Sequence, residues 1–145
     1  MKTNGGFLVT KIKQLGDRIF ERILAEKNID AFNGAQGRIL YVLWQEDGVP
    51  IKNISEKSGL AITSLTTMLE RMEKNGLISR KTDEADKRKT LLFLTDKAKK
   101  LKEAYDSVSN EMGNIYYRDF TDKEILQFEE YLNRIRVNLE EWSDK

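Results

Sequence analysis

The sequence predicts a mainly α (α+β) protein in which one short β-hairpin interrupts a series of amphipathic helices. Three observations lead to this fold class. Apolar residues recur at spacings of three and four over most of the chain, which is typical of helices with one buried face. Residues 77–94 instead contain two runs of strand-forming residues around a charged loop. The length of 145 residues matches a single domain with one main core.

The composition excludes several kinds of chemistry. Cysteine and histidine are both absent, so disulfides, thiol oxidation, imidazole catalysis and zinc sites with nitrogen or sulfur ligands are ruled out. We expect neither a metal nor a cofactor. No apolar run is long enough for a signal peptide or for a membrane span of about 18 residues. We therefore expect a soluble, cytoplasmic protein with no membrane partner.

Charge is segregated along the chain, although the net charge is only +1. Residues 1–51 sum to +1, residues 52–102 to +6 and residues 103–145 to −6. A basic segment beside an acidic one suggests that the middle third meets an anionic partner while the C-terminal third stays away from it. Ordinary solvated charge is the alternative that composition alone leaves open.

The first two helices are predicted from apolar spacing and from a capping pattern. Residues 7–27 form one helix with a single apolar stripe. Asn33 and Gln36 match a capping box that begins a second helix, and Asp47 with Gly48 ends it. The apolar positions are Leu8, Ile12, Leu15, Ile19 and Ile23 in the first helix and Ile39, Leu40, Leu43 and Trp44 in the second.

The most specific helical pattern is a short helix at residues 52–57, followed by Gly59 and by a longer helix at residues 62–75 that Gly76 ends. Apolar residues of both helices can form one small core, whereas the opposite face of the longer helix has short hydroxyl side chains and an arginine. A recognition helix needs this division, because only a short polar face can approach base edges in a major groove. An ordinary helical hairpin with a solvated face is the alternative. The core positions are Ile54, Leu60, Leu65, Met68, Leu69 and Met72, and the outer positions are Thr63, Ser64, Thr66, Thr67 and Arg71.

A β-hairpin follows these helices directly and favours the nucleic-acid interpretation. Residues 77–82 and 90–94 are strand-like, and the loop between them ends in three adjacent bases. A projecting wing can bring such a basic tip to backbone phosphates or to a minor groove beside a recognition helix. The basic residues of the tip are Lys87, Arg88 and Lys89.

The acidic residues of the same loop need a separate explanation. Asp86 precedes Arg88 by two residues, and we expect the two to pair across the turn. Because an exposed ion pair contributes little to stability, the expected role of Asp86 is to fix the direction of the guanidinium. Asp83 and Glu84 are expected to be solvated.

Two further helices are predicted after the hairpin. Thr95 can cap a long helix that ends near Phe120. Thr121 and Glu124 form a capping box for a last helix, whose apolar residues keep heptad spacing to the end of the chain. Such a seam needs a partner surface, which is either the first helix of the same chain or a second copy of the chain. The heptad positions are Ile125, Phe128, Leu132, Ile135, Leu139 and Trp142.

The stretch LERMEKNGLISRKTDEADKRKTLLFLTDKAK, residues 69–99, resembles the winged helix-turn-helix of the MarR family of transcription regulators. The shared elements are a leucine-rich recognition helix, a Gly-Leu turn, a wing with Asp-x-Arg, and Leu-x-Leu-Thr opening a long helix. Family members often have an arginine at the position of Thr67 and a polar cap near Ala61, so this chain departs from the pattern there. The shared motifs are Gly76-Leu77, Asp86-Lys87-Arg88 and Leu92-Phe93-Leu94-Thr95.

The resemblance implies a sequence-specific DNA-binding transcriptional regulator, a repressor, that binds a palindromic operator in double-stranded DNA as a homodimer. Its DNA-binding lobe would be residues 33–94, and residues 1–30 and 95–145 would form a helical dimerisation lobe. Two recognition helices would then lie about 34–36 Å apart, one turn of the duplex. The resemblance also implies a small aromatic or lipophilic acid as effector, bound between the two lobes.

Candidate residues follow for each surface. The DNA contacts are expected from Thr63, Ser64, Thr66, Thr67, Arg71, Lys81, Lys87, Arg88 and Lys89, with Asp86 as support for the wing. The effector pocket is expected to be lined by Phe20, Tyr41, Trp44, Tyr105 and Met112, for which ordinary core packing is the alternative. The dimer interface is expected to contain Leu8, Ile12, Phe120, Phe128, Leu132, Ile135, Leu139 and Trp142.

Two other classes of function fit less well. An enzyme would need an acid–base pair, and the acidic pairs Glu129-Glu130 and Glu140-Glu141 are adjacent residues that do not face one another on a helix. We therefore expect no enzyme activity. The remaining alternative is a winged-helix module that contacts protein without binding DNA, because a fold does not dictate its function. The basic wing argues against this alternative.

Overall fold

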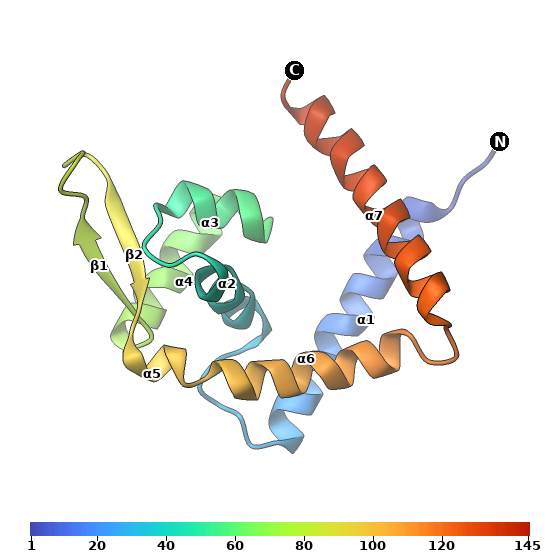
Figure 1. The fold of residues 1–145 in the computed structure, drawn as a ribbon, viewed down its shortest axis with the longest axis horizontal. Helices are drawn as coiled ribbons and strands as arrows, with labels where there is room; N and C mark the ends of the chain where they lie inside the picture. Colours follow the sequence, from blue (N-terminus) through green and yellow to red (C-terminus); the bar gives the residue numbers. More distant parts are fainter. The chain divides into compact units, whose positions relative to one another are not determined.

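The computed structural model describes residues 1–145 and confirms the predicted class, mainly helical with one small sheet (Figure 1). None of its helices combines the length and the apolar character that crossing a membrane requires. The elements in chain order are α1 Gly5–Glu26, α2 Gly34–Gln45, α3 Ile51–Ser58, α4 Ile62–Lys74, β1 Ile78–Thr82, β2 Thr90–Leu94, α5 Asp96–Lys99, α6 Lys102–Tyr116 and α7 Asp122–Ser143.

The chain divides into two compact units, Met1–Asn110 and Glu111–Lys145. Every buried hydrophobic side chain lies between Ile23 and Val108, so the first unit contains the core. The side chains with the least exposure come from several elements of that unit. They include Leu40 and Leu43 of α2, Ile54 of α3, Leu65 and Leu69 of α4, and Leu92 of β2.

The hairpin of the first unit is an antiparallel pair in which Ile78 lies opposite Leu94 and Thr82 opposite Thr90. Figure 1 shows it beside α3 and α4. The sequence predicts only these two strands, but the structure adds a third segment at the base of the wing. Val49 forms an isolated bridge to Leu92, with backbone bonds in both directions. This bridge joins the end of α2 to β2.

Both predicted capping boxes are confirmed. The Asn33 side chain accepts a bond from the Gln36 N–H at 2.8 Å, and the Gln36 side chain accepts one from the Asn33 N–H. Thr121 and Glu124 make the same reciprocal pair at the start of α7. These pairs satisfy backbone N–H groups that have no partner within a helix, which is why both helices begin where the sequence indicates.

The single long helix predicted after Thr95 is wrong, because the chain there forms two helices, α5 and α6. Thr95 does cap α5, accepting a bond from the Ala98 N–H at 3.2 Å. The break follows at Leu101, whose N–H donates to the Ala98 carbonyl three residues back. The same carbonyl accepts a bond from the Trp44 indole at 3.2 Å. In a continuous helix, the Ala98 carbonyl would accept a hydrogen bond from the N–H four residues later. Here the Trp44 indole, which is distant in the sequence, donates to this carbonyl instead.

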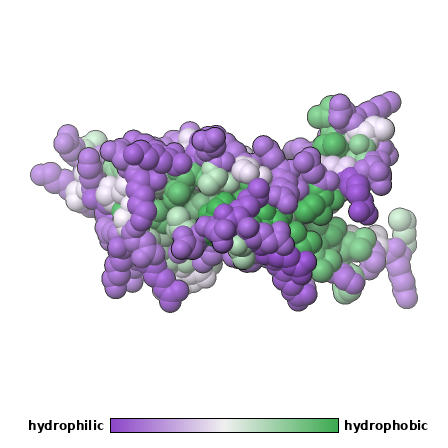
Figure 2. All heavy atoms as spheres, turned by 90° about the horizontal axis from the view of Figure 1, so that it is seen from below, coloured by the Kyte–Doolittle hydropathy of each residue, from purple (hydrophilic) through white to green (hydrophobic).

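The second unit begins within α6 and contains α7, which has no buried residue over its 22 positions. This unit contains an aromatic group formed by the turn before α7 and the first part of α7. The ring of Tyr117 lies 5.6 Å from that of Phe120 and 6.2 Å from that of Phe128, measured between centroids. The Tyr117 hydroxyl donates to Glu129 at 2.7 Å. The apolar residues of α7 after Phe128 remain exposed. Figure 2 shows strongly hydrophobic residues in green on one face of the molecule.

Candidate nucleic-acid interface

The turn between α3 and α4 is held by two serine side chains of α3. The Ser55 hydroxyl donates to the Leu60 carbonyl at 2.7 Å, and the Ser58 hydroxyl accepts a bond from the Leu60 N–H at 3.1 Å. Gly59 ends α3 with φ of +76°, a left-handed conformation that side chains rarely adopt. These contacts set the angle at which α4 leaves the turn. Sequence analysis did not identify the two serines, because no motif marks them.

Helix α4 has the two predicted faces. Leu65, Leu69 and Met72 are fully buried against the core, whereas the side chains of the predicted outer face are exposed. One of these hydroxyls has an internal partner, because Thr66 donates to the Ile62 carbonyl at 2.9 Å. Its oxygen therefore remains free only as an acceptor. The exposed outer positions are Thr63, Ser64, Thr66, Thr67 and Arg71.

The N-terminus of α4 has no side-chain cap. Ala61 occupies the N-cap position, and the first turn contains no acidic residue. The positive end of the helix dipole is therefore not neutralised by the chain itself. Gly76 follows the C-terminal end with φ of +74°, as the sequence predicts.

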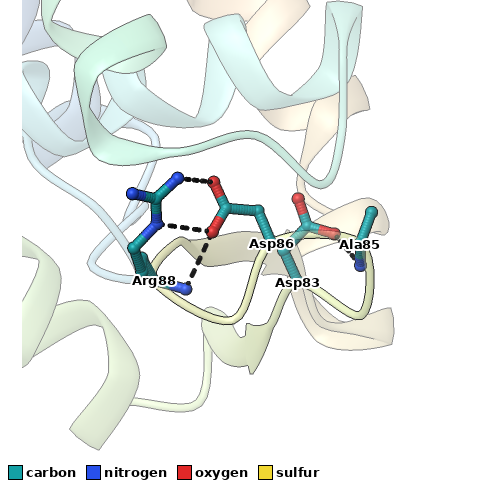
Figure 3. Close-up of polar contacts among 4 residues, drawn as sticks. All are labelled: Asp83, Ala85, Asp86 and Arg88. Atoms are coloured by element: carbon teal, nitrogen blue, oxygen red, sulfur yellow. Dashed lines mark hydrogen bonds and ion pairs between the residues drawn. The ribbon is translucent and has the colours of Figure 1, made fainter.

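The wing tip is a short, hydrogen-bonded loop. The Asp83 N–H donates to the Lys89 carbonyl at 3.0 Å, and the Lys89 N–H donates to the Asp86 carbonyl at 3.0 Å. The expectation that Asp83 is merely solvated is wrong, because its carboxylate accepts a bond from the Ala85 N–H at 2.9 Å (Figure 3). A hydrogen bond from an aspartate side chain to the N–H two residues later stabilises a turn. The sequence alone does not show that this bond forms. All three bases of the tip are exposed.

Asp86 and Arg88 form the predicted pair (Figure 3). The two carboxylate oxygens accept bonds from Nε at 3.0 Å and from Nη2 at 3.3 Å, and the Arg88 backbone N–H also donates to Asp86. The Arg88 side chain is nevertheless 91% exposed. The hydrogen bonds from Arg88 lower the pKa of the Asp86 carboxyl below its ordinary value of 3.8. The guanidinium is therefore oriented by its neighbour and still accessible to a ligand.

The wing is connected to both ends of the helix-turn-helix. At its base, the Asp47 carboxylate accepts a bond from the Leu94 N–H at 2.8 Å. At the C-terminal end of α4, the Thr95 hydroxyl donates to the Gly76 carbonyl at 2.6 Å and Lys97 donates to the Asn75 carbonyl at 3.1 Å. These bonds fix the wing and α4 relative to each other within one unit.

The residues expected to line an effector pocket separate into two groups. Tyr105 lies at the centre of the first group, with ring centroids of Trp44 at 5.3 Å, Tyr41 at 5.8 Å and Phe20 at 6.2 Å. Burial is the main cause that raises the pKa of the Tyr105 phenol above 10.0. Met112 belongs to the other unit. The other three aromatic rings thus pack around Tyr105, and the role of these four side chains in binding a ligand stays a prediction.

The residues expected at a dimer interface lie on α1, on α7 and on the loop before α7. Most are exposed in the single chain, and Phe128 is half-buried. The exposed members of this set are Leu8, Ile12, Phe120, Leu132, Ile135, Leu139 and Trp142.

A helix-turn-helix with an exposed hydroxyl face, followed by a two-stranded wing with a basic tip, defines a winged helix-turn-helix protein. The family model described as "MarR family" matches residues 32–90, the segment that contains these elements. This match confirms, for residues 32–90, the resemblance to the MarR family that the sequence indicates.

Named relatives agree with this resemblance. The chain is 36% identical over 77 residues to the HTH-type transcriptional regulator TtmR of Methylorubrum extorquens (strain PA1), over 53% of this chain and 40% of that protein. It is 42% identical over 64 residues to the organic hydroperoxide resistance transcriptional regulator of Bacillus subtilis (strain 168), over 44% of each protein. The matches thus span less than half the length of these relatives, both of which are named as regulators rather than enzymes.

The fold also matches a solved structure over most of its length. The crystal structure of a mutant MarR from E. coli complexed with operator DNA has a TM-score of 0.80 to this chain, with 22% sequence identity. The match covers 90% of this chain and 91% of that one. At this identity the likeness establishes the fold.

Proposed function

We propose that this chain is a sequence-specific transcriptional regulator, a repressor, that binds a palindromic operator in double-stranded DNA as a homodimer. The observation that supports this function best is the exposed hydroxyl face of α4 beside an exposed basic wing, with both fixed in one unit. The names of the relatives and the operator DNA held by the similar E. coli protein point the same way.

In this proposal, the hydroxyl residues of α4 contact bases and the cations contact phosphates. Hydroxyl groups discriminate between bases less sharply than a bidentate arginine or asparagine. Thr66 has the fewest ways to contact a base, because its hydroxyl already donates its proton to the Ile62 carbonyl. It would accept a bond from the amino group of adenine or cytosine. The phosphate contacts would be made by Arg71, Lys81, Lys87, Arg88 and Lys89.

A salt titration tests the phosphate contacts. We expect log Kd for a duplex to vary with log salt concentration by a slope of about 0.9 per phosphate neutralised. Lys87→Gln should reduce the slope by about 0.9, the value for one contact. Lys145→Gln, which removes the same charge from the acidic segment 103–145, should leave the slope unchanged. A flat salt dependence, or no mobility shift with any genomic fragment, would instead favour a module that contacts only protein.

We infer that the homodimer forms through the apolar residues of α1 and α7. The support is that α7 carries an apolar heptad seam, yet no residue of this helix is buried in the single chain. A two-fold dimer would present two α4 helices to successive major grooves about 34–36 Å apart. Selection of bound fragments from random duplex DNA should return a palindrome with half-sites about one turn apart. A single, non-repeated half-site would contradict the two-fold arrangement.

We also infer a small aromatic or lipophilic acid as the effector, bound at the aromatic group around Tyr105. A ligand changes DNA affinity only if it binds one conformation of the protein better than another. We expect benzoate or octanoate to weaken binding to the selected operator, and Tyr105→Leu to abolish that effect. Dimers whose operator affinity is unchanged by either acid would be constitutive repressors.

A further inference from the structure

Lys81 lies beside an aromatic ring, whereas Arg80 and Arg88 of the same hairpin each lie beside a carboxylate. Arg88 pairs with Asp86, and Arg80 pairs with Glu73 of α4 at 3.4 Å. Lys81 has no carboxylate partner, and its ammonium lies 5.3 Å from the centroid of the Phe93 ring. The side chain is exposed. It is therefore a cation that an aromatic ring, rather than an acid, holds in place.

The strand register brings these two side chains together. Ser79 lies opposite Phe93, and Lys81 lies opposite Leu91. Lys81 and Phe93 are thus diagonal neighbours on one face of the hairpin, a separation that long and aromatic side chains can bridge. The residue directly opposite Phe93, Ser79, has only a small side chain.

The Phe93 ring also packs closely against the backbone of Gly48. A Cβ atom built on Gly48 would lie 2.6 Å from Cε1 and 2.9 Å from Cζ of Phe93, closer than real Cβ contacts come. Gly48 also has φ of +69°. Hydrogen bonds on both sides of Phe93 fix this approach, since the Gly48 N–H donates to the Leu92 carbonyl and Asp47 accepts from the Leu94 N–H. Only glycine fits between this turn and the ring.

We propose that Phe93, seated on Gly48, is a positioning residue that orders Lys81 for contact with a DNA phosphate. This inference rests on the proposed DNA-binding function. A free lysine side chain loses much rotational freedom when it binds a phosphate, and ordering it in advance reduces that loss. The ring face attracts the ammonium without neutralising its charge. The ammonium has three donors and is exposed, so it can bind a phosphate while it stays over the ring.

A double-mutant cycle tests the inference with the operator selected above. We expect Phe93→Leu to weaken binding by about two- to fivefold, the range for an exposed cation–π contact. In the Lys81→Gln background, the same substitution should change Kd by less than about 1.5-fold, because the interaction is already lost. Phe93→Tyr keeps the ring face and should restore wild-type affinity. Equal weakening by Phe93→Leu in both backgrounds would show that Phe93 supports only the fold of the wing and would overturn the inference.

A second measurement needs no DNA and separates this inference from the proposed function. In the free wild-type protein, the ring current of Phe93 should shift the proton resonances of the Lys81 side-chain methylenes upfield, and Phe93→Leu should remove the shift. Methylene resonances at unperturbed positions in the wild type would overturn the inference even if the operator is bound tightly. A chain that shows the upfield shift but binds no duplex would instead overturn the proposed function, and the phosphate role of Lys81 with it.

Discussion

At the residue scale, Arg88 shows how an exposed cation can be oriented without being buried. Its backbone N–H and its guanidinium bond to the same carboxylate of Asp86. Because these bonds lower the pKa of Asp86, the carboxylate stays ionised down to a pH below 3.8. The orientation of Arg88 therefore does not change near neutral pH. The exposed ammonium of Lys81 also lies beside one group, in this case the Phe93 ring instead of a carboxylate.

Tyr117 provides a pH prediction at the same scale. Burial among aromatic rings, followed by the hydrogen bond to Glu129, raises the pKa of its phenol to about 12. The fold favours the neutral phenol, so this stabilisation is fully present below the unfolded pKa of about 10. It is lost as the pH rises through about 12. We expect the free energy of unfolding of Tyr117→Phe to fall less than that of the wild type over this alkaline range.

Ultraviolet absorbance of tyrosinate against pH measures the titration directly. Of the five tyrosines, one should ionise near pH 12, and Tyr117→Phe should remove that step. Tyr131→Phe is the matched control on α7 and should leave the step in place. A step near pH 12 that survives in Tyr117→Phe would contradict the assignment.

At the element scale, the two faces of α4 should separate stability from DNA binding. Leu69 is fully buried, so Leu69→Ala should reduce the free energy of unfolding by about 2–5 kcal/mol through lost packing and a cavity. Thr67 is exposed, and Thr67→Ala should change stability by no more than about 0.5 kcal/mol while weakening operator binding. Urea denaturation and an operator titration measure the two effects. Thr67→Ala as destabilising as Leu69→Ala would contradict the division of faces.

At the scale of the whole molecule, α7 raises the question of what stabilises it. It has 22 residues and no buried side chain, whereas helices in proteins gain most of their stability from packing of an apolar face against another surface. Leu139 and Trp142 of the heptad seam are 66% and 73% exposed. A second chain packed on this seam would bury them, which is the physical basis for the proposed dimer.

Leu139→Glu tests the seam. We expect the substitution to shift the chain from dimer to monomer in sedimentation equilibrium and to weaken operator binding, because a charge would be buried in an apolar interface. Gln127→Glu adds the same charge to α7 outside the heptad positions and should leave the dimer intact. If both variants remain dimeric, the seam is not the interface.

Local sequence signals predicted most of the fold correctly. The Asn33–Gln36 and Thr121–Glu124 capping boxes mark helix starts, and apolar spacing places the buried face of α4. The loop beginning at Asp83 and the pair of Asp86 with Arg88 involve neighbours only two residues apart. Even so, the bond of Asp83 to the Ala85 N–H was not predicted, because a solvated aspartate and one that holds a turn have the same sequence.

The sequence by itself determined most of the helices, the wing and the basic charge at its tip, because capping and periodicity act between residues a few positions apart. Only the tertiary structure decided the break in the helix at Leu101, the hydrogen bond between Asp47 and Leu94, and the packing of the Phe93 ring against Gly48. Each of these depends on atoms brought together from more than forty positions away, as the 47-residue separation of Asp47 and Leu94 illustrates. Packing in three dimensions selects such contacts, and no local pattern records them.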